Sequence, residues 1–253
     1  MRLYDPRRYN VPTPPPLRLF LMHLDLSQFD AAIVDLDGTM VDTLGDFAVA
    51  LNLMLADLAL PPIEARHVEA MVGKGSEHLI VSVLNHVAPP RSGSAQVAQS
   101  DAIYQRAWER YQHHYLAING QHSSVYPGVV EGLTALRSQG LRLACLTNKP
   151  TDFAKPLLAA KGLDGFFAHV FGGDAFARKK PDPLPLRMTC EALGSRPART
   201  LMIGDSSNDA RAARAAGCPV VLVSYGYNHG EPVGGVDADG VVDSLAELST
   251  NAR

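Results

Sequence analysis

Short apolar segments recur along the chain and are separated by stretches in which apolar residues have helical spacing. They occupy positions 31–34, 141–146, 169–171, 200–203 and 220–223. Runs of this length, alternating with helices, are typical of parallel strands that are buried on both faces and joined by right-handed crossovers. We therefore predict an α/β fold with a doubly wound, Rossmann-like parallel sheet.

A long helical stretch interrupts this alternation after the first strand. Positions 46–122 contain no strand-like run, and their apolar residues follow the spacing of amphipathic helices, as in Phe47, Leu51 and Met54. An insertion of roughly 75 residues far exceeds an ordinary connection between a strand and a helix. We predict an all-helical cap domain at 46–122, inserted into a core domain formed by 29–45 and 123–253.

Two helices of the predicted core have informative boundaries. Gly140 should stop a helix over 129–139, because glycine is the preferred residue just after a helix end. Pro156 lies inside a second helical pattern, over 151–161, where proline removes a hydrogen-bond donor. That helix either starts at Lys155 or bends at the proline.

The first 28 residues differ in composition from the rest of the chain. They contain four prolines between positions 12 and 16, and the apolar run at 17–22 is too short to span a bilayer. The run also lacks the small-residue cleavage site of a signal peptide. We expect a flexible or loosely docked extension at 1–28; alternatively, translation begins at Met22.

Composition and charge restrict the compartment and the partners. The chain is 46% hydrophobic and 19% charged, with a formal net charge of −3, so it offers no basic surface field for nucleic acid. Cys145, Cys190 and Cys218 are odd in number and lack metal-site spacing, which indicates a reducing compartment. We expect a cytoplasmic monomer or homodimer without disulfides, nucleic acid or membrane contact.

Two acids follow the first predicted strand and introduce candidate chemistry. Asp35 and Asp37 precede Gly38, and alternate residues of an extended chain point the same way, roughly 6–7 Å apart. One carboxylate at such a strand end can attack a substrate while the other transfers protons. The alternative is a solvated turn, because Asp-Gly is common in turns.

Three further polar runs follow or flank later strands, at 147–149, 178–183 and 204–209. Each run alone is a weak signal, since many strands end in polar turns. All four in this order, with a helical insertion after the first, resemble the motifs of the haloacid dehalogenase superfamily of phosphotransferases. The resemblance extends from about position 29 to 248 and implies hydrolysis of a phosphate ester.

This resemblance assigns a role to each acid of the first motif. Asp35 is expected to be the nucleophile that forms an aspartyl-phosphate. Asp37 is expected to protonate the leaving alcohol and then deprotonate water. Asp35, the backbone carbonyl of Asp37 and Asp205 are expected to hold Mg²⁺, with Asp209 behind them orienting a water or a lysine.

The same resemblance assigns the phosphate contacts. Thr147 and Asn148 are expected to hold phosphoryl oxygens, and Lys180 is expected to balance their charge. Lysine directly before proline selects Lys180 over its neighbour Lys179. Gly38 is expected to let the backbone turn closely beside the substrate.

Four segments, at 42–43, 71–79, 126–129 and 225–232, resemble bacterial phosphoglycolate phosphatases. That resemblance implies Mg²⁺-dependent hydrolysis of 2-phosphoglycolate, with Lys74 as a ligand of the substrate carboxylate. The alternative for Lys74 is an exposed residue in an ordinary turn between helices. The alternative substrate is another small metabolite such as a sugar phosphate, for a related phosphatase or a phosphoglucomutase-like enzyme. A non-catalytic binding protein that kept the fold is a third alternative.

Overall fold

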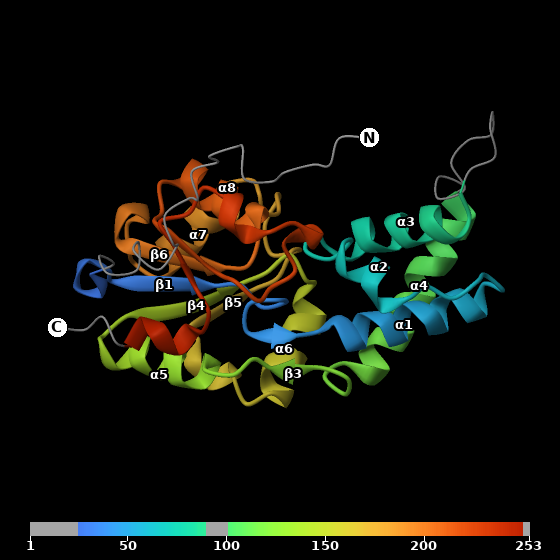
Figure 1. Ribbon diagram of the computed structural model, residues 1–253, viewed down its shortest axis with the longest axis horizontal. Helices are drawn as coiled ribbons and strands as arrows, with labels where there is room; N and C mark the ends of the chain where they lie inside the picture. The colour runs from blue at the N-terminus through green and yellow to red at the C-terminus, as the bar shows by residue number, and fades with distance from the viewer. Residues whose placement is uncertain (1–24, 90–100, 250–253) are drawn as a thin grey trace, which may run out of the picture.

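The computed structural model describes residues 25–89 and 101–249, and its centre is a six-stranded sheet (Figure 1). All paired strands of this sheet are parallel. The predicted doubly wound parallel sheet is thus confirmed. Across the sheet the strands are β5 (His169–Phe171), β4 (Arg142–Leu146), β1 (Ala31–Val34), β6 (Thr200–Gly204), β7 (Val220–Val223) and β8 (Gly240–Val242).

Helices cover both faces of the sheet because the strands are apolar on both sides. In β1, Ala32 and Val34 pack into one hydrophobic cluster, whereas Ala31 and Ile33 pack into the other. Burying a valine or isoleucine side chain contributes about 1.5–3 kcal/mol, which favours the centre of the sheet for this strand. The covering helices are α5 (Val129–Ser138) and α6 (Thr151–Ala160) on the first face, and α7 (Leu184–Ala192) and α8 (Ser207–Ala216) on the second.

The predicted element boundaries differ from the structure at a few positions. The helix α5 ends just before Gly140, whose φ of 86° is the left-handed conformation expected at such a stop. The helix α6 begins at Thr151 and contains Pro156, so the interpretation that it starts at Lys155 is wrong. The edge strand β8 was not predicted, because its three residues are too few to show a pattern.

Four helices form a separate unit beyond one end of the sheet (Figure 1), and they share their own hydrophobic cluster. The chain enters and leaves this unit through a short antiparallel pair of strands, β2 (Val41–Asp42) and β3 (Ser124–Val125). The domain limits at 46 and 122 stay a prediction. The helices are α1 (Leu44–Asp57), α2 (Ala65–Glu69), α3 (Ser76–Val87) and α4 (Asp101–Ile118).

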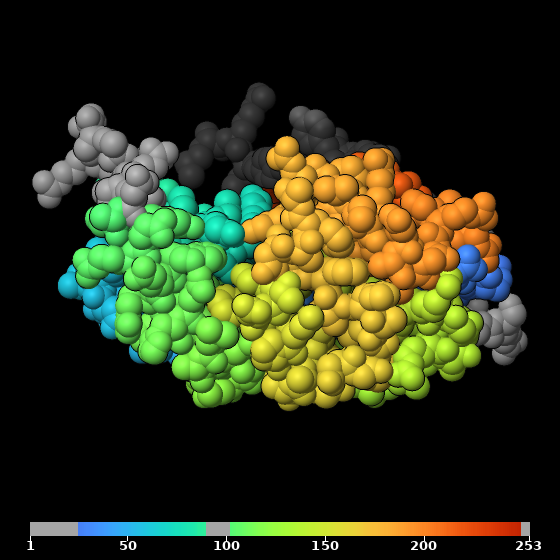
Figure 2. Space-filling view, turned by 180° about the vertical axis from the view of Figure 1, so that it is seen from behind, coloured from blue at the N-terminus to red at the C-terminus, as the bar shows by residue number. Residues whose placement is uncertain are grey.

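A buried carboxylate joins the two connections between the helical unit and the sheet. Asp46, in the first turn of α1, accepts hydrogen bonds from the backbone amides of Gly120 (2.8 Å) and His122 (2.7 Å). The ammonium of Lys161 donates to the carbonyls of Gly120 and Ser123, at 2.7 and 2.6 Å. Seen from behind, the green surface of α4 lies against the yellow surface that includes α6 (Figure 2).

The end of the predicted N-terminal extension packs against the core. Leu26, inside the predicted extension at 1–28, lies in a short 3-10 helix (Leu26–Gln28) and is buried in the cluster beneath α5. The extension itself stays a prediction. Met22 and the prolines lie outside the described residues. Among the helices of residues 25–89 and 101–249, none combines the length and hydropathy that crossing a bilayer requires.

Candidate active site

The polar runs meet at the carboxyl edge of the sheet because β1 lies between β4 and β6. Val34 is in register with Cys145 on one side and with Ile203 on the other. The next residue, Asp35, donates its backbone amide to the carbonyl of Ile203 at 2.9 Å. Parallel strands present their carboxyl ends at one edge, so residues from distant parts of the chain gather there.

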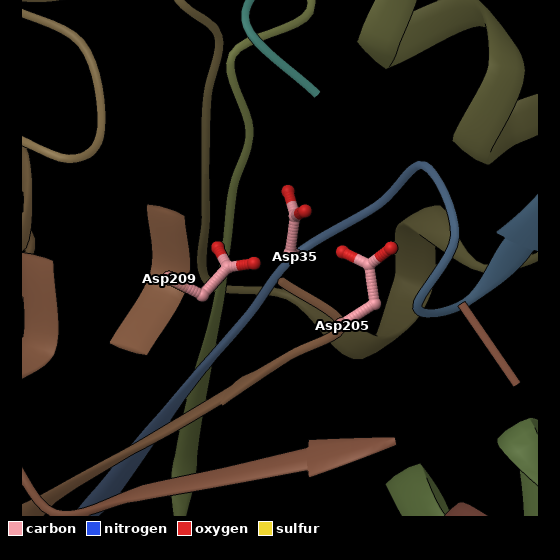
Figure 3. Close-up of side chains that lie close together, drawn as sticks. All are labelled: Asp35, Asp205 and Asp209. Atoms are coloured by element: carbon pink, nitrogen blue, oxygen red, sulfur yellow. The ribbon is translucent and has the colours of Figure 1, made fainter. Parts of the chain in front are cut away.

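Three carboxylates gather at this edge from the ends of β1 and β6 and the first turn of α8 (Figure 3). One oxygen each from Asp35, Asp205 and Asp209 lies within 4.8 Å of the others, and all three residues are buried. A capping box orients Asp209, whose Oδ2 accepts from the hydroxyl (2.7 Å) and the amide (3.2 Å) of Ser206. The first turn of α8 therefore holds one member of this acidic cluster in place.

A buried lysine lies against the acidic cluster. The ammonium of Lys180, whose side chain is 3% exposed, lies 2.7 Å from Asp209 Oδ1 and 2.8 Å from Asp35 Oδ1. It also donates to the carbonyl of Leu146 at 2.9 Å. Burial alone would lower the pKa of Lys180, but the charges of Asp209 and Asp35 together raise it. The lysine therefore remains a cation at neutral pH.

One ammonium does not compensate three buried carboxylates. Burial raises the pKa of Asp35 to about 7, and the charge of Asp209 contributes in the same direction. Burial, followed by the charges of Asp209 and Asp35, raises the pKa of Asp205 well above its ordinary value. The three buried carboxylates therefore carry more negative charge than the single ammonium of Lys180 balances. Buried carboxylate oxygens with excess negative charge fit a hard divalent cation.

The carboxylate of Asp37 points away from this cluster, into a second set of contacts. Its Oδ1 accepts from the hydroxyl of Thr43 and from the ammonium of Lys149, both at 2.8 Å. The side chain of Lys149 is 1% exposed, and its ammonium lies 4.5 Å from the ring centroid of Phe47 and 4.7 Å from that of Tyr115. The two acids of the first motif therefore occupy different electrostatic surroundings.

Asn148 connects three segments of the site. Its amide group donates to the carbonyls of Lys180 (2.9 Å) and Gly73 (3.1 Å), and its oxygen accepts from the amide of Lys180 at 3.0 Å. These bonds position the lysine and hold the loop before α3 against the sheet edge. In this arrangement the Asn148 side chain binds backbone groups. Both Asn148 and Thr147, beside it, line the pocket.

A pocket lies between the two acids of the first motif and the helical unit. It has about 460 Å³ of empty space, part of which is open to solvent. Gly73 and Gly75 line it, but Lys74 between them does not and is exposed. The predicted role of Lys74 stays a prediction. The pocket is lined by Asp35, Asp37, Phe47, Val72, Gly73, Gly75, Ser76, Leu79, Thr147, Asn148, Lys149, Lys180, Ser206, Asn208 and Asp209.

Gly38 serves close packing rather than the pocket surface. Its φ is 81°, and a Cβ there would overlap Asp205 Oδ2 and lie 2.9 Å from the ring of Tyr227. The backbone amide of Tyr227 donates to Asp205 Oδ2 at 2.7 Å, so this segment orients a member of the acidic cluster. Sequence patterns did not single out Tyr227. Lys149 could have been found, because it ends the polar run after β4.

The parallel sheet, the helical unit over its carboxyl edge and the acidic cluster together define an enzyme with a Rossmann-like α/β core and a helical cap. Residues 29–217 match the family model described as haloacid dehalogenase-like hydrolase. The match spans more than half of the chain. The chain belongs to the haloacid dehalogenase-like hydrolases, and it is therefore an enzyme of the hydrolase class.

Two similar proteins carry the name phosphoglycolate phosphatase. The phosphoglycolate phosphatase of Thiobacillus denitrificans is 44% identical over 219 residues, which cover 87% of this chain and 93% of the relative. The phosphoglycolate phosphatase of Nitrosospira multiformis is 41% identical over 228 residues, covering 90% and 97%. Within the family, the chain is thus similar to enzymes of this name.

Solved structures agree with the fold. A predicted phosphoglycolate phosphatase from Haemophilus somnus superposes with a TM-score of 0.82 at 33% identity, covering 88% of this chain and 97% of its own. CbbY from Rhodobacter sphaeroides, in complex with phosphate, superposes with a TM-score of 0.69 at 25% identity, covering 87% and 96%. The architecture of sheet and cap is thus shared with these hydrolases.

Proposed function

We propose that this protein is a Mg²⁺-dependent phosphomonoester hydrolase that converts 2-phosphoglycolate to glycolate and phosphate through an aspartyl-phosphate. The observation that carries the proposal is the buried set of Asp35, Asp205, Asp209 and Lys180, of which all but Asp205 line the pocket. The relatives named phosphoglycolate phosphatase support the choice of substrate. The complex of CbbY with phosphate supports a phosphorylated ligand at such a site.

Asp35 is the proposed nucleophile. One of its oxygens forms a bond to phosphorus while the bond from phosphorus to the leaving alcohol oxygen breaks, which leaves an acyl phosphate on the aspartate. Water then attacks phosphorus and releases phosphate together with the original carboxylate. Asp35 lines the pocket, and the ammonium of Lys180 lies 2.8 Å from its Oδ1. This contact supports the assignment because the positive charge favours the ionised carboxylate that attack requires.

Asp37 is the proposed acid and base. In its protonated form it transfers its proton to the leaving alcohol oxygen, and its carboxylate later accepts a proton from the attacking water. The hydroxyl of Thr43 and the ammonium of Lys149 keep this carboxyl group in the pocket wall. Its separation from the acidic cluster supports a proton-transfer role distinct from attack.

Lys180 is proposed to balance the charge on the transferred phosphoryl oxygens, with the hydroxyl of Thr147 as a hydrogen-bond donor. Asp35, Asp205 and the backbone carbonyl of Asp37 would hold Mg²⁺, which reduces the repulsion between a carboxylate and a phosphate dianion when it is bound. The contact between Asp209 and Lys180 supports a role for Asp209 in orienting the lysine.

A substrate panel measured with and without Mg²⁺ tests the proposal. We expect phosphoglycolate to have the highest kcat/KM, and Asp35→Asn to lower kcat at least about 1,000-fold because it removes the nucleophile. Asp152→Asn, on the exposed side of α6, is the matched control. An Asp35→Asn variant with the parent's activity would sink the mechanism. A preference for a sugar phosphate would instead favour the sugar-phosphate alternative, in line with the xylulose-1,5-bisphosphate complex of CbbY.

A further inference from the structure

The site contains a second buried lysine that the phosphoryl chemistry does not use. Lys149 lines the pocket, and its ammonium contacts Asp37 Oδ1 at 2.8 Å. Lys180 already provides a cation at the acidic cluster. The side chain of Lys149 is 1% exposed, so this ammonium presents a desolvated positive charge at the pocket, where contact with an anion is strong.

The proposed reaction brings the leaving group of the substrate close to Lys149. Asp37 transfers its proton to the leaving oxygen, and the ammonium of Lys149 contacts Oδ1 of this same carboxyl group at 2.8 Å. The ring faces of Phe47 and Tyr115, the other close neighbours of the ammonium, attract a cation more weakly than a carboxylate does. A substrate with a second negative group beside the leaving oxygen would gain a charge-assisted contact with this ammonium.

The geometry also specifies where on the substrate that group belongs. The leaving oxygen must approach Asp37 to take its proton, so the leaving group lies beside the ammonium of Lys149. In a phosphorylated 2-hydroxy acid the carboxylate carbon is two covalent bonds from that oxygen. Phe47 and Leu79 line the same pocket with apolar side chains, so among its lining residues the ammonium of Lys149 is the positive charge closest to this part of the leaving group.

We infer that Lys149 is the residue that recognises a carboxylate in the leaving group, and that it makes the enzyme selective for small phosphorylated 2-hydroxy acids. This inference rests on the proposed function. It assigns to Lys149 the role that the sequence suggested for Lys74, which is exposed and does not line the pocket.

The parent enzyme provides the first test, through two esters of nearly equal shape. Phosphoglycolate carries the carboxylate, and its amide, phosphoglycolamide, does not. We expect kcat/KM to be about 10- to 100-fold higher for phosphoglycolate, the range of one charge-assisted hydrogen bond. Equal values for the two esters would overturn the inference without touching the phosphatase activity. A parent that hydrolyses neither ester would overturn the proposed function and the inference together.

The variant Lys149→Met provides the second test, because methionine has similar length and no charge. Its ratio of kcat/KM between the two esters should fall to within about threefold of one, chiefly through a higher KM for phosphoglycolate. A role only through Asp37 would lower kcat for both esters and leave the ratio unchanged, which would contradict the inference. Lys155→Met, on the exposed surface of α6, is the matched control and should keep the parent's ratio.

Lys74→Met separates the two lysines. If this variant, rather than Lys149→Met, abolishes the preference for phosphoglycolate, Lys74 is the carboxylate ligand and the inference is wrong. Circular dichroism verifies that each variant is folded. Should Lys149→Met not fold, the ratio in the parent together with the Lys74→Met result decides the question.

Discussion

Replacing Gly38 with alanine should displace Asp205, a member of the acidic cluster. The Cβ of the alanine would overlap Asp205 Oδ2, lie 3.0 Å from Asp205 Cγ and lie 2.9 Å from Tyr227 Cδ2. The backbone at this position also has a φ of 81°, which side chains disfavour. Asp205 therefore has to move, and with it one of the proposed metal ligands.

Gly140 is a control that separates strain from crowding. Its φ is 86°, close to that of Gly38, but a Cβ there would meet nothing within 4 Å. Left-handed strain costs about 1–2 kcal/mol, which is the whole cost expected for Gly140→Ala. Overpacking adds about 1–3 kcal/mol, so Gly38→Ala should lose about 2–5 kcal/mol of unfolding free energy.

Urea unfolding followed by circular dichroism measures both losses, and steady-state kinetics over a Mg²⁺ titration measures the site. We expect Gly140→Ala to keep kcat within about twofold, because it lies at a distant helix end. Gly38→Ala should lose at least about tenfold in kcat and need more Mg²⁺. Equal stability losses in the two variants, or an unchanged Mg²⁺ requirement for Gly38→Ala, would refute this reasoning.

Two further predictions concern the segment that follows β7. The hydroxyl of Tyr227 donates to Asp42 at 2.8 Å and accepts from the amide of Thr43 at 2.7 Å. The variant Tyr227→Phe should therefore lower the unfolding free energy, measured by urea unfolding, by about 1–3 kcal/mol. A loss within error of zero would contradict this expectation. Burial, then the charge of Lys74, lowers the pKa of His229 below 6.5. The imidazole of His229 therefore binds a proton more tightly in the unfolded chain than in the folded chain. The stability that the folded chain has above pH 6.5 should be lost as the pH falls through the folded-state pKa of His229. The variant His229→Asn should show a smaller loss between pH 7 and pH 5 than the parent, and an identical loss would contradict the assignment.

The order of the polar runs was enough to predict that most of the site residues would meet. Asp35, Thr147 and Asp205 each follow an apolar strand, and the carboxyl ends of parallel strands share one edge. Local pattern therefore predicted the sheet and the acids at its edge, whereas the resemblance to the family selected Lys180. It did not determine the pair β2 and β3 or the strand β8, because two or three residues carry no periodicity.

The tertiary structure alone decided which lysine faces the substrate pocket. Both Lys74 and Lys149 stand in polar runs that suggest anion binding, and nothing local distinguishes them. Only packing places Lys149 between Phe47 of the helical unit and Asp37 of the sheet edge, while Lys74 stays exposed. The sequence by itself determined the elements and the chemistry at their ends, because those depend on neighbours along the chain. The surroundings of each side chain depend on how the helical unit packs over the sheet.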